Sequence, residues 1–224
     1  MLLLALDTAT PAVTVAVHDG TRVLAEAIEI GARRHGEVLT PMLGAVLAAA
    51  GHGVGDVTDL AVGVGPGPYT SLRVGLMTAL AFALPAGLPV HGVCSLDVLA
   101  FEAVTDGRWA AELADGFLVA TDARRKEVYW AAYGPDGVRT SGPSVDRPAD
   151  VAAAYPGRTV VGQGGDLYRD QLGAPVGPTY PGAAALATLA VRALASGEPL
   201  LPPTPLYLRR PDAVEPPPRK RVLS

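Results

Sequence analysis

Residues 60–84 constrain the fold of this chain more than any other segment, because they join three kinds of local structure without a break. Residues 60–64 form a short apolar run that predicts a buried strand. The turn Gly65-Pro66-Gly67-Pro68 follows, and a helix is predicted from about Thr70 to residue 84. In a layered α/β protein the first N–H groups of such a helix face outward, where they can hold an anion or a partner's carbonyl.

The predicted helix has no evident water-facing side, since residues 74–84 include no charged side chain. Such a helix is either buried in the core of an α/β domain or presents one face to a partner subunit. We expect both to hold, with one face on a sheet and another on a partner.

Composition limits the class of protein. The length of 224 residues suits one large domain or two small ones. A net charge of −4 argues against a protein that binds nucleic acid alone, which needs a broad basic surface. The single cysteine, Cys94, excludes an internal disulfide and is expected to be a buried thiol. The apolar run in residues 1–10 is too short for a membrane span or a signal peptide, so we expect a cytoplasmic protein.

The two halves of the chain begin alike. Residues 2–6, 13–18 and 22–30 predict three strands, and Asp7 follows the first of them. Residues 116–121 and 127–133 predict a second hairpin, with Asp122 after its first strand. This repeat predicts two related lobes that meet near residues 105–116. The expected division is an N-terminal lobe of residues 1–105, a C-terminal lobe of residues 106–210 and a flexible proline-rich basic tail of residues 211–224.

Polar turns follow several predicted strands. In an α/β protein such turns converge at the carboxyl ends of strands, around a cleft between two halves. An Asp after the first strand of each lobe predicts a nucleotide-binding cleft, although each Asp could instead accept backbone N–H bonds in its own turn. The candidate nucleotide-binding residues are Asp7, Thr8, Thr10, Asp122, Gly162, Gly164 and Gly165. The basic turn of residues 124–126 could contact a phosphate or be solvated.

No complete catalytic motif accompanies these turns. A Walker phosphate loop needs a lysine, and none lies near the turn at Gly65. His18, His35, His52 and His91 lack the spacing of metal ligands, so we expect no bound metal. The serine elbow Gly-x-Ser-x-Gly is also missing from the sequence.

The run Gly65-Pro66-Gly67-Pro68-Tyr69-Thr70-Ser71-Leu72-Arg73 resembles the signature Gly-Pro-Gly-Ser-Phe-Thr-Gly-Leu-Arg of the TsaB (YeaZ) family. The resemblance covers about residues 1–210, and the chain departs from the family pattern at Pro68, Ser71 and Gln163. Further matching segments are residues 4–10, 35–41, 92–96, 122–124, 127–130, 161–165 and 205–209.

The resemblance implies an α/β protein with the actin-like, Hsp70-like ATPase (ASKHA) fold, in which two related lobes each have a mixed sheet and flanking helices. It implies a non-catalytic dimerisation and scaffold subunit of the complex that transfers threonylcarbamoyl to the adenosine beside the tRNA anticodon. The implied partners are a catalytic TsaD-type subunit, which this chain would bind and activate, and a TsaE-type ATPase. The chain would reach tRNA only through the complex.

The same resemblance implies no catalytic residue and no cofactor in this chain, although a nucleotide held loosely or at an interface is compatible with it. The TsaD-type subunit carries metal-binding histidines spaced His-x3-His. The matching segment here, His91-Gly92-Val93-Cys94-Ser95, has no second histidine.

Two other functions compete with the scaffold. One is an independent ATPase or kinase-like enzyme of the same fold, with Asp7 and Asp122 around a magnesium nucleotide. The other is a glycoprotease-like metalloprotein, which the missing metal ligands oppose.

The scaffold hypothesis predicts that the helices of residues 37–50 and 70–84 lie side by side and present an apolar face to a partner. Ala79 is expected to face outward on this surface, which could also form a homodimer of the free chain. The predicted interface residues are Leu39, Leu43, Val46, Thr70, Arg73, Gly75, Thr78, Ala79 and Phe82.

Overall fold

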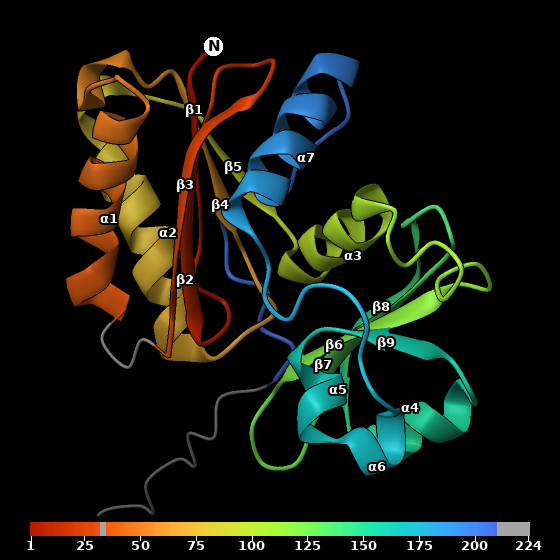
Figure 1. Ribbon diagram of the computed structural model, residues 1–224. Helices are drawn as coiled ribbons and strands as arrows, with labels where there is room; N and C mark the ends of the chain where they lie inside the picture. The colour runs from red at the N-terminus through yellow and green to blue at the C-terminus, as the bar shows by residue number, and fades with distance from the viewer. Residues whose placement is uncertain (32–34, 210–224) are drawn as a thin grey trace, which may run out of the picture.

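The computed structural model describes residues 1–31 and 35–209, which form two lobes, each built on its own sheet (Figure 1). The first sheet has the strand order β3-β2-β1-β4-β5. Its strands are β1 (Leu3–Asp7), β2 (Ala12–His18), β3 (Val23–Ile30), β4 (Asp59–Gly63) and β5 (Val90–Val93). β1 pairs antiparallel with β2 and parallel with β4, so the sheet is mixed.

The second sheet repeats this arrangement with the order β8-β7-β6-β9. Its strands are β6 (Phe117–Asp122), β7 (Val128–Tyr133), β8 (Arg139–Asp146) and β9 (Thr159–Val161). β6 pairs antiparallel with β7 and parallel with β9, as β1 does with β2 and β4. The predicted two related lobes are therefore confirmed. Strand β8 was not predicted, because its sequence RTSGPSVD has no alternation of apolar residues.

Helices cover both faces of the first sheet. α1 (His35–Ala49) and α2 (Tyr69–Ala83) lie side by side on one face, and α7 (Ala183–Ser196) covers the other (Figure 1). α3 (Ser95–Asp106) packs between α7 and the second sheet. The short helices are η1 (Val54–Asp56), η2 (Leu84–Ala86), α4 (Pro148–Ala154), α5 (Gln163–Leu167) and α6 (Arg169–Leu172). None of the helices in the described residues is long and apolar enough to cross a membrane.

The position of α7 corrects the predicted lobe boundary. Residues 106–210 were assigned to the C-terminal lobe, but α7 packs on the first sheet through Leu186, Ala187 and Ala190, which meet Leu3 and Ala5 of β1. The physical reason is that β1 is buried along its whole length, so both faces of the first sheet need a cover. The predicted tail, residues 211–224, lies outside the described residues.

After α7 the chain runs back along the first lobe and reaches the second. The N–H of Gly92 donates to Leu201 O (2.7 Å), and the N–H of Leu206 donates to Val64 O (2.8 Å). We call residues 199–209 the C-terminal strap. It ends at the β6–β7 hairpin, where Arg209 Nη1 donates to Ala123 O (3.2 Å).

The structure also corrects the predicted interface. Leu39, Leu43 and Val46 of α1, with Ala79 of α2, belong to the core between these helices and the first sheet, and Ala79 is 0% exposed. Gly75 is buried as well, so the expectation that this part of α2 faces outward is wrong. Beyond Arg73, α2 has no charged residue that would mark which face meets the sheet. Of the other predicted interface residues, Thr70 and Arg73 are exposed, and Thr78 and Phe82 are half-buried.

Candidate functional site

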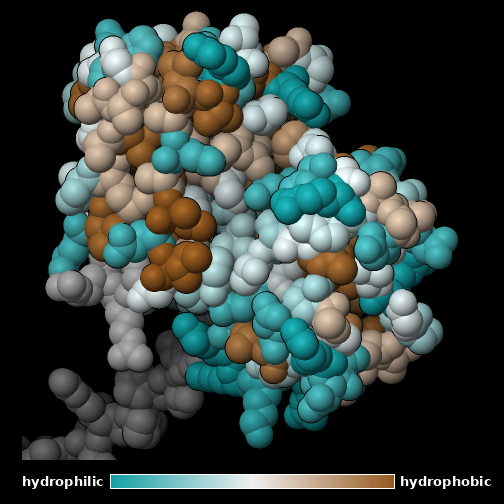
Figure 2. All heavy atoms as spheres, viewed as in Figure 1, coloured by the Kyte–Doolittle hydropathy of each residue, from teal (hydrophilic) through white to brown (hydrophobic). Residues whose placement is uncertain are grey.

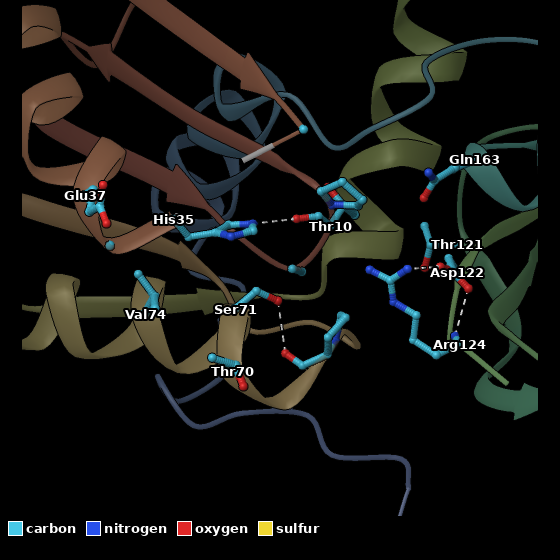
Figure 3. A pocket seen from close by; sticks show the side chains of 15 residues that line it. Thr10, His35, Glu37, Thr70, Ser71, Val74, Thr121, Asp122, Arg124 and Gln163 are labelled. Atoms are coloured by element: carbon cyan, nitrogen blue, oxygen red, sulfur yellow. Dashed lines mark hydrogen bonds and ion pairs between the residues drawn. The ribbon is translucent and has the colours of Figure 1, made fainter. Parts of the chain in front are cut away.

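A cavity of about 720 Å³ lies between the lobes, at the ends of β1 and β6 (Figure 3). The first lobe contributes the turn after β1 and the first turns of α1 and α2, and the second lobe contributes the end of β6 and the start of α5. Its lining residues are Ala9, Thr10, Pro11, Gly31, His35, Gly36, Glu37, Pro68, Thr70, Ser71, Val74, Thr121, Asp122, Arg124 and Gln163.

Close packing of backbone fixes the first-lobe wall. The Nε2 atom of His35 lies 3.1 Å from Thr10 O, which joins the start of α1 to the turn after β1. The glycine-rich turn before α2 approaches this same turn so closely that a Cβ on Gly67 would collide with Ala9 O. This contact explains why the turn after β4 needs glycine at position 67.

The second-lobe wall is charged. Asp122 Oδ1 accepts a hydrogen bond from the N–H of Arg124 (2.8 Å), and Asp122 Oδ2 pairs with Arg124 Nη1 (3.1 Å). Arg124, Arg125 and Lys126 have φ angles of 63°, 53° and 63°, so three consecutive non-glycine residues are left-handed. Each such residue costs about 1–2 kcal/mol, so this turn holds its basic side chains in an unfavourable backbone conformation.

Asp7 lies beside the cavity but is buried away from it. Its Oδ1 accepts a hydrogen bond from the N–H of Ala9 and its Oδ2 from Ser95 Oγ, both at 2.6 Å. The side chain packs directly against Gly63 of β4. Burial raises the pKa of Asp7 to about 6, although both hydrogen bonds lower it. Both oxygens of the Asp7 carboxylate are therefore used in hydrogen bonds within the protein. This agrees with the alternative that Asp7 accepts N–H bonds in its own turn.

The Thr8 hydroxyl also makes its hydrogen bonds within the protein. Its Oγ1 donates to Ser71 O (2.7 Å) and accepts from the N–H of Gly75 (3.1 Å), tying the turn after β1 to α2. The glycines that follow β9 serve close packing: a Cβ on Gly164 would lie 2.7 Å from the Ala120 Cβ. A Cβ on Gly165 would lie 2.7 Å from the Pro175 Cβ, and Gly162 is buried against Ala120 O.

Of the predicted nucleotide-binding residues, only Thr10 and Asp122 line the cavity in the described part of the chain. The actin-like fold that the resemblance implies would hold a magnesium nucleotide, and these residues do not fit it. Asp7 offers no free carboxylate, Asp122 is paired with Arg124, and the three glycines pack against neighbouring residues of the second lobe. Among the described residues, no group of three or more His, Cys, Asp or Glu side chains is placed to hold a metal ion.

Sequence reasoning missed several residues that shape this site. Ser95, 88 positions from Asp7, is the donor that fixes its carboxylate. Gln163 Nε2 donates to the Tyr180 hydroxyl (3.2 Å), while its buried Oε1 has no hydrogen-bond partner among the described residues. Tyr207 of the C-terminal strap stacks on Tyr69 at the start of α2. These contacts join segments far apart in sequence, so no local pattern indicates them.

Two lobes with the same strand arrangement and a cavity between them define a protein with the actin-like ATPase fold. A family model described as TsaD, tRNA N6-adenosine threonylcarbamoyltransferase, matches residues 24–176. The solved structure of YeaZ from Pseudomonas aeruginosa superposes with a TM-score of 0.77 at 31% identity, covering 92% of this chain and 99% of that one. The chain belongs to the TsaB/YeaZ family.

Sequence relatives agree with this assignment. An uncharacterised protein of Mycobacterium tuberculosis is 44% identical over 214 residues, which cover 94% of this chain and 92% of that protein. The tRNA threonylcarbamoyladenosine biosynthesis protein TsaB of Escherichia coli is 40% identical over 136 residues, 61% of this chain and 56% of that protein. The chain is therefore homologous to proteins of tRNA threonylcarbamoyladenosine biosynthesis.

Proposed function

We propose that this chain is the non-catalytic scaffold subunit of a cytoplasmic complex that transfers threonylcarbamoyl to tRNA adenosine, and that it binds and activates a TsaD-type catalytic subunit. The observation that carries this proposal is the outward face of α1 and α2. Figure 2 shows the α1 side of the first lobe, where the atoms over α1 are mostly pale brown and the most strongly apolar atoms lie beside them, over β3.

The residues of this face are small or apolar and carry no charge. We call it the α1–α2 face; it comprises Pro41, Gly44, Ala45 and Ala48 of α1, Met77 and Ala81 of α2, and Leu84. Met77 is 51% exposed and Leu84 80% exposed, which is unusual for side chains of this size. An uncharged surface on two adjacent helices is typical of subunit contacts, and Gly44 and Ala45 allow a partner helix to approach closely.

The absence of catalytic machinery in this chain is part of the proposal. It is supported by the internal hydrogen bonds of Asp7 and by the pairing of Asp122 with Arg124. No observation favours the alternative of an independent ATPase or kinase-like enzyme. The α1–α2 face could also pair with a second copy of the free chain, and a TsaE-type ATPase would join the assembled complex.

Met77→Arg is expected to abolish co-purification with the TsaD-type subunit while the chain stays folded. The substitution places a charge in the middle of the α1–α2 face, where a partner would bury it without a counter-charge. In the free chain the arginine stays in contact with water, because Met77 is exposed to solvent. Affinity pull-down of the co-expressed subunit, with thermal melting of the free variant, measures both results.

Leu167→Arg is the matched control, since Leu167 is an apolar side chain of the second lobe with nearly the same exposure, 49%. It should co-purify as the wild type does. Binding by the Met77→Arg variant at wild-type level would place the partner elsewhere and refute the assigned surface. Tight magnesium-ATP binding with turnover by the isolated chain would instead support the kinase-like alternative.

A further inference from the structure

The two sheets have four edge strands, β3 and β5 in the first sheet and β8 and β9 in the second. The edge at β5 is covered, because Gly92 forms a β-bridge with Leu201 of the C-terminal strap. The edge at β9 is covered in the same way, by a bridge between Val161 and Val176. β8 contains Pro143, which has no N–H to donate, and its pairing with β7 is irregular. Within the part of the chain that the structure describes, β3 is therefore the edge left open.

The main chain of β3 presents hydrogen-bonding groups on its open side. The N–H of Gly31 donates to Pro11 O (3.1 Å), and β3 pairs with β2 in antiparallel register. In such a pair, alternate residues direct their N–H and C=O groups to opposite sides of the strand. Counting back from Gly31 in steps of two gives the residues that bond β2, so Glu26, Ile28 and Ile30 direct their groups outward. Among the described residues, none bonds these outward groups.

The side chains on this edge are unusually apolar. Ile28 is 57% exposed and Ile30 61% exposed, and Figure 2 shows strongly apolar atoms over β3. Ile28 lies opposite Thr14 of β2, whose hydroxyl donates to Pro181 O just before α7 (3.1 Å), so both isoleucines lie on the α7 side of the sheet. An open edge with exposed apolar side chains is a surface on which another strand pairs.

We propose that β3 pairs antiparallel with β3 of a second copy of this chain, around a two-fold axis at Ile28, so that the first sheets of the two copies become one continuous sheet. This inference goes beyond the proposed function and does not depend on it. In this register Ile28 lies opposite Ile28 of the second copy, and Ile30 lies opposite Glu26 of the second copy. Each of these pairs exchanges two main-chain hydrogen bonds through the outward groups.

The positions of the carboxylates favour a second copy in this register. An axis at Glu26 or at Glu29 would set two carboxylates directly opposite each other, which is destabilising. The axis at Ile28 sets Glu29 opposite Ala27 instead. It also brings Ile28 and Ile30 of both copies into one apolar cluster, with Glu26 of each copy at its ends. The strand is thus complementary to itself in both shape and charge.

This dimer leaves the α1–α2 face available on α2. Antiparallel pairing keeps the two faces of each sheet on the same sides, so α1 of one copy lies on the same face as α1 of the other. α2 packs over β4 and β1, and β2 separates these strands from β3. Met77 of α2 therefore lies away from the proposed contact, which distinguishes this dimer from one formed through the α1–α2 face.

The first test is sedimentation of the purified full-length chain over a concentration series that reaches the micromolar range, where we expect a monomer–dimer equilibrium. Ile28→Lys should raise the dimer Kd at least about tenfold, because it removes the isoleucine pair and sets two ammonium groups opposite each other. Ile30→Lys is the matched control, at similar exposure two residues along the strand. It should dimerise at least as well as the wild type, because its ammonium lies opposite Glu26 of the second copy.

The second test is oxidative cross-linking of Ile28→Cys. The native Cys94 is 2% exposed and does not compete. Opposite residues of a hydrogen-bonded antiparallel pair have Cα atoms about 5.5 Å apart, within the range of a disulfide. We therefore expect most of the Ile28→Cys chains to migrate as disulfide-linked dimers. Leu167→Cys is the control, since it places a thiol at 49% exposure on the second lobe and should stay monomeric.

A wild-type chain that stays monomeric throughout the series would overturn the proposal, and would leave β3 to a strand of another protein. Equal weakening by Ile28→Lys and Ile30→Lys would overturn it as well, because the register would then be wrong. Met77→Arg should dimerise as the wild type does; loss of the dimer in that variant would place the contact on the α1–α2 face. None of these measurements uses the TsaD-type subunit, so they succeed or fail independently of the proposed function.

Discussion

Replacing Ala79 with arginine is expected to unfold the first lobe. The Ala79 side chain is 0% exposed in the core between α2 and the first sheet, with Leu76 and Ala83 on the same side of the helix. A guanidinium there has no counter-charge and no space. An uncompensated buried charge costs about 3–5 kcal/mol, a large part of the roughly 5–15 kcal/mol by which an ordinary domain is stable. Thermal or urea unfolding of the purified variant measures the loss.

Ala81→Arg is the matched control, because it makes the same substitution two residues along the same helix at an exposed position. This variant should unfold within a few degrees of the wild type. If the Ala79→Arg and Ala81→Arg variants unfold at the same temperature, the side of α2 that includes Ala79 does not pack on the first sheet. Comparing Ala79→Arg with Ala81→Arg also distinguishes the two sides of α2. Ala79 lies on the side that packs in the core, whereas Ala81 belongs to the α1–α2 face, which Met77→Arg tests.

Asp7 is expected to make the protein less stable as the pH rises. Its pKa in the folded state is about 6, above the ordinary value of 3.8 that applies when the chain unfolds, because burial disfavours the charged carboxylate. The stabilising contribution of Asp7 is therefore fully present below about pH 4 and is lost as the pH rises through about 6. The difference between the two pKa values corresponds to about 3 kcal/mol.

Asp7→Asn tests this, since the amide has the same shape and does not ionise. Between pH 3 and pH 8 the free energy of unfolding of the wild type should fall by about 3 kcal/mol more than that of the variant, measured by urea denaturation at each pH. Ser95→Ala removes the hydroxyl that lowers the pKa of Asp7, so its loss of stability should extend to higher pH. Parallel pH profiles for the wild type and Asp7→Asn would contradict the assignment.

The local sequence determined the order and type of most elements. The apolar run before the glycine-rich turn became β4, the segment after it became α2, and residues 116–121 became most of β6. The repeated strand, aspartate and hairpin also predicted two related lobes, because periodicity and turn residues act over a few neighbours and need no knowledge of distant packing. The signature at Gly65 indicated the family for the same reason.

Only the tertiary structure decided which side chains face inward. Ala79 and Asp7 were read from sequence as surface and site residues, yet both are buried, Ala79 by the first sheet and Asp7 behind Gly63 with Ser95 as its donor. Packing between distant segments also placed α7 on the first lobe and brought Tyr207 into contact with Tyr69. Burial and pairing of this kind depend on segments many residues apart, whose approach is set by the packing of the whole sheet and not by any local pattern.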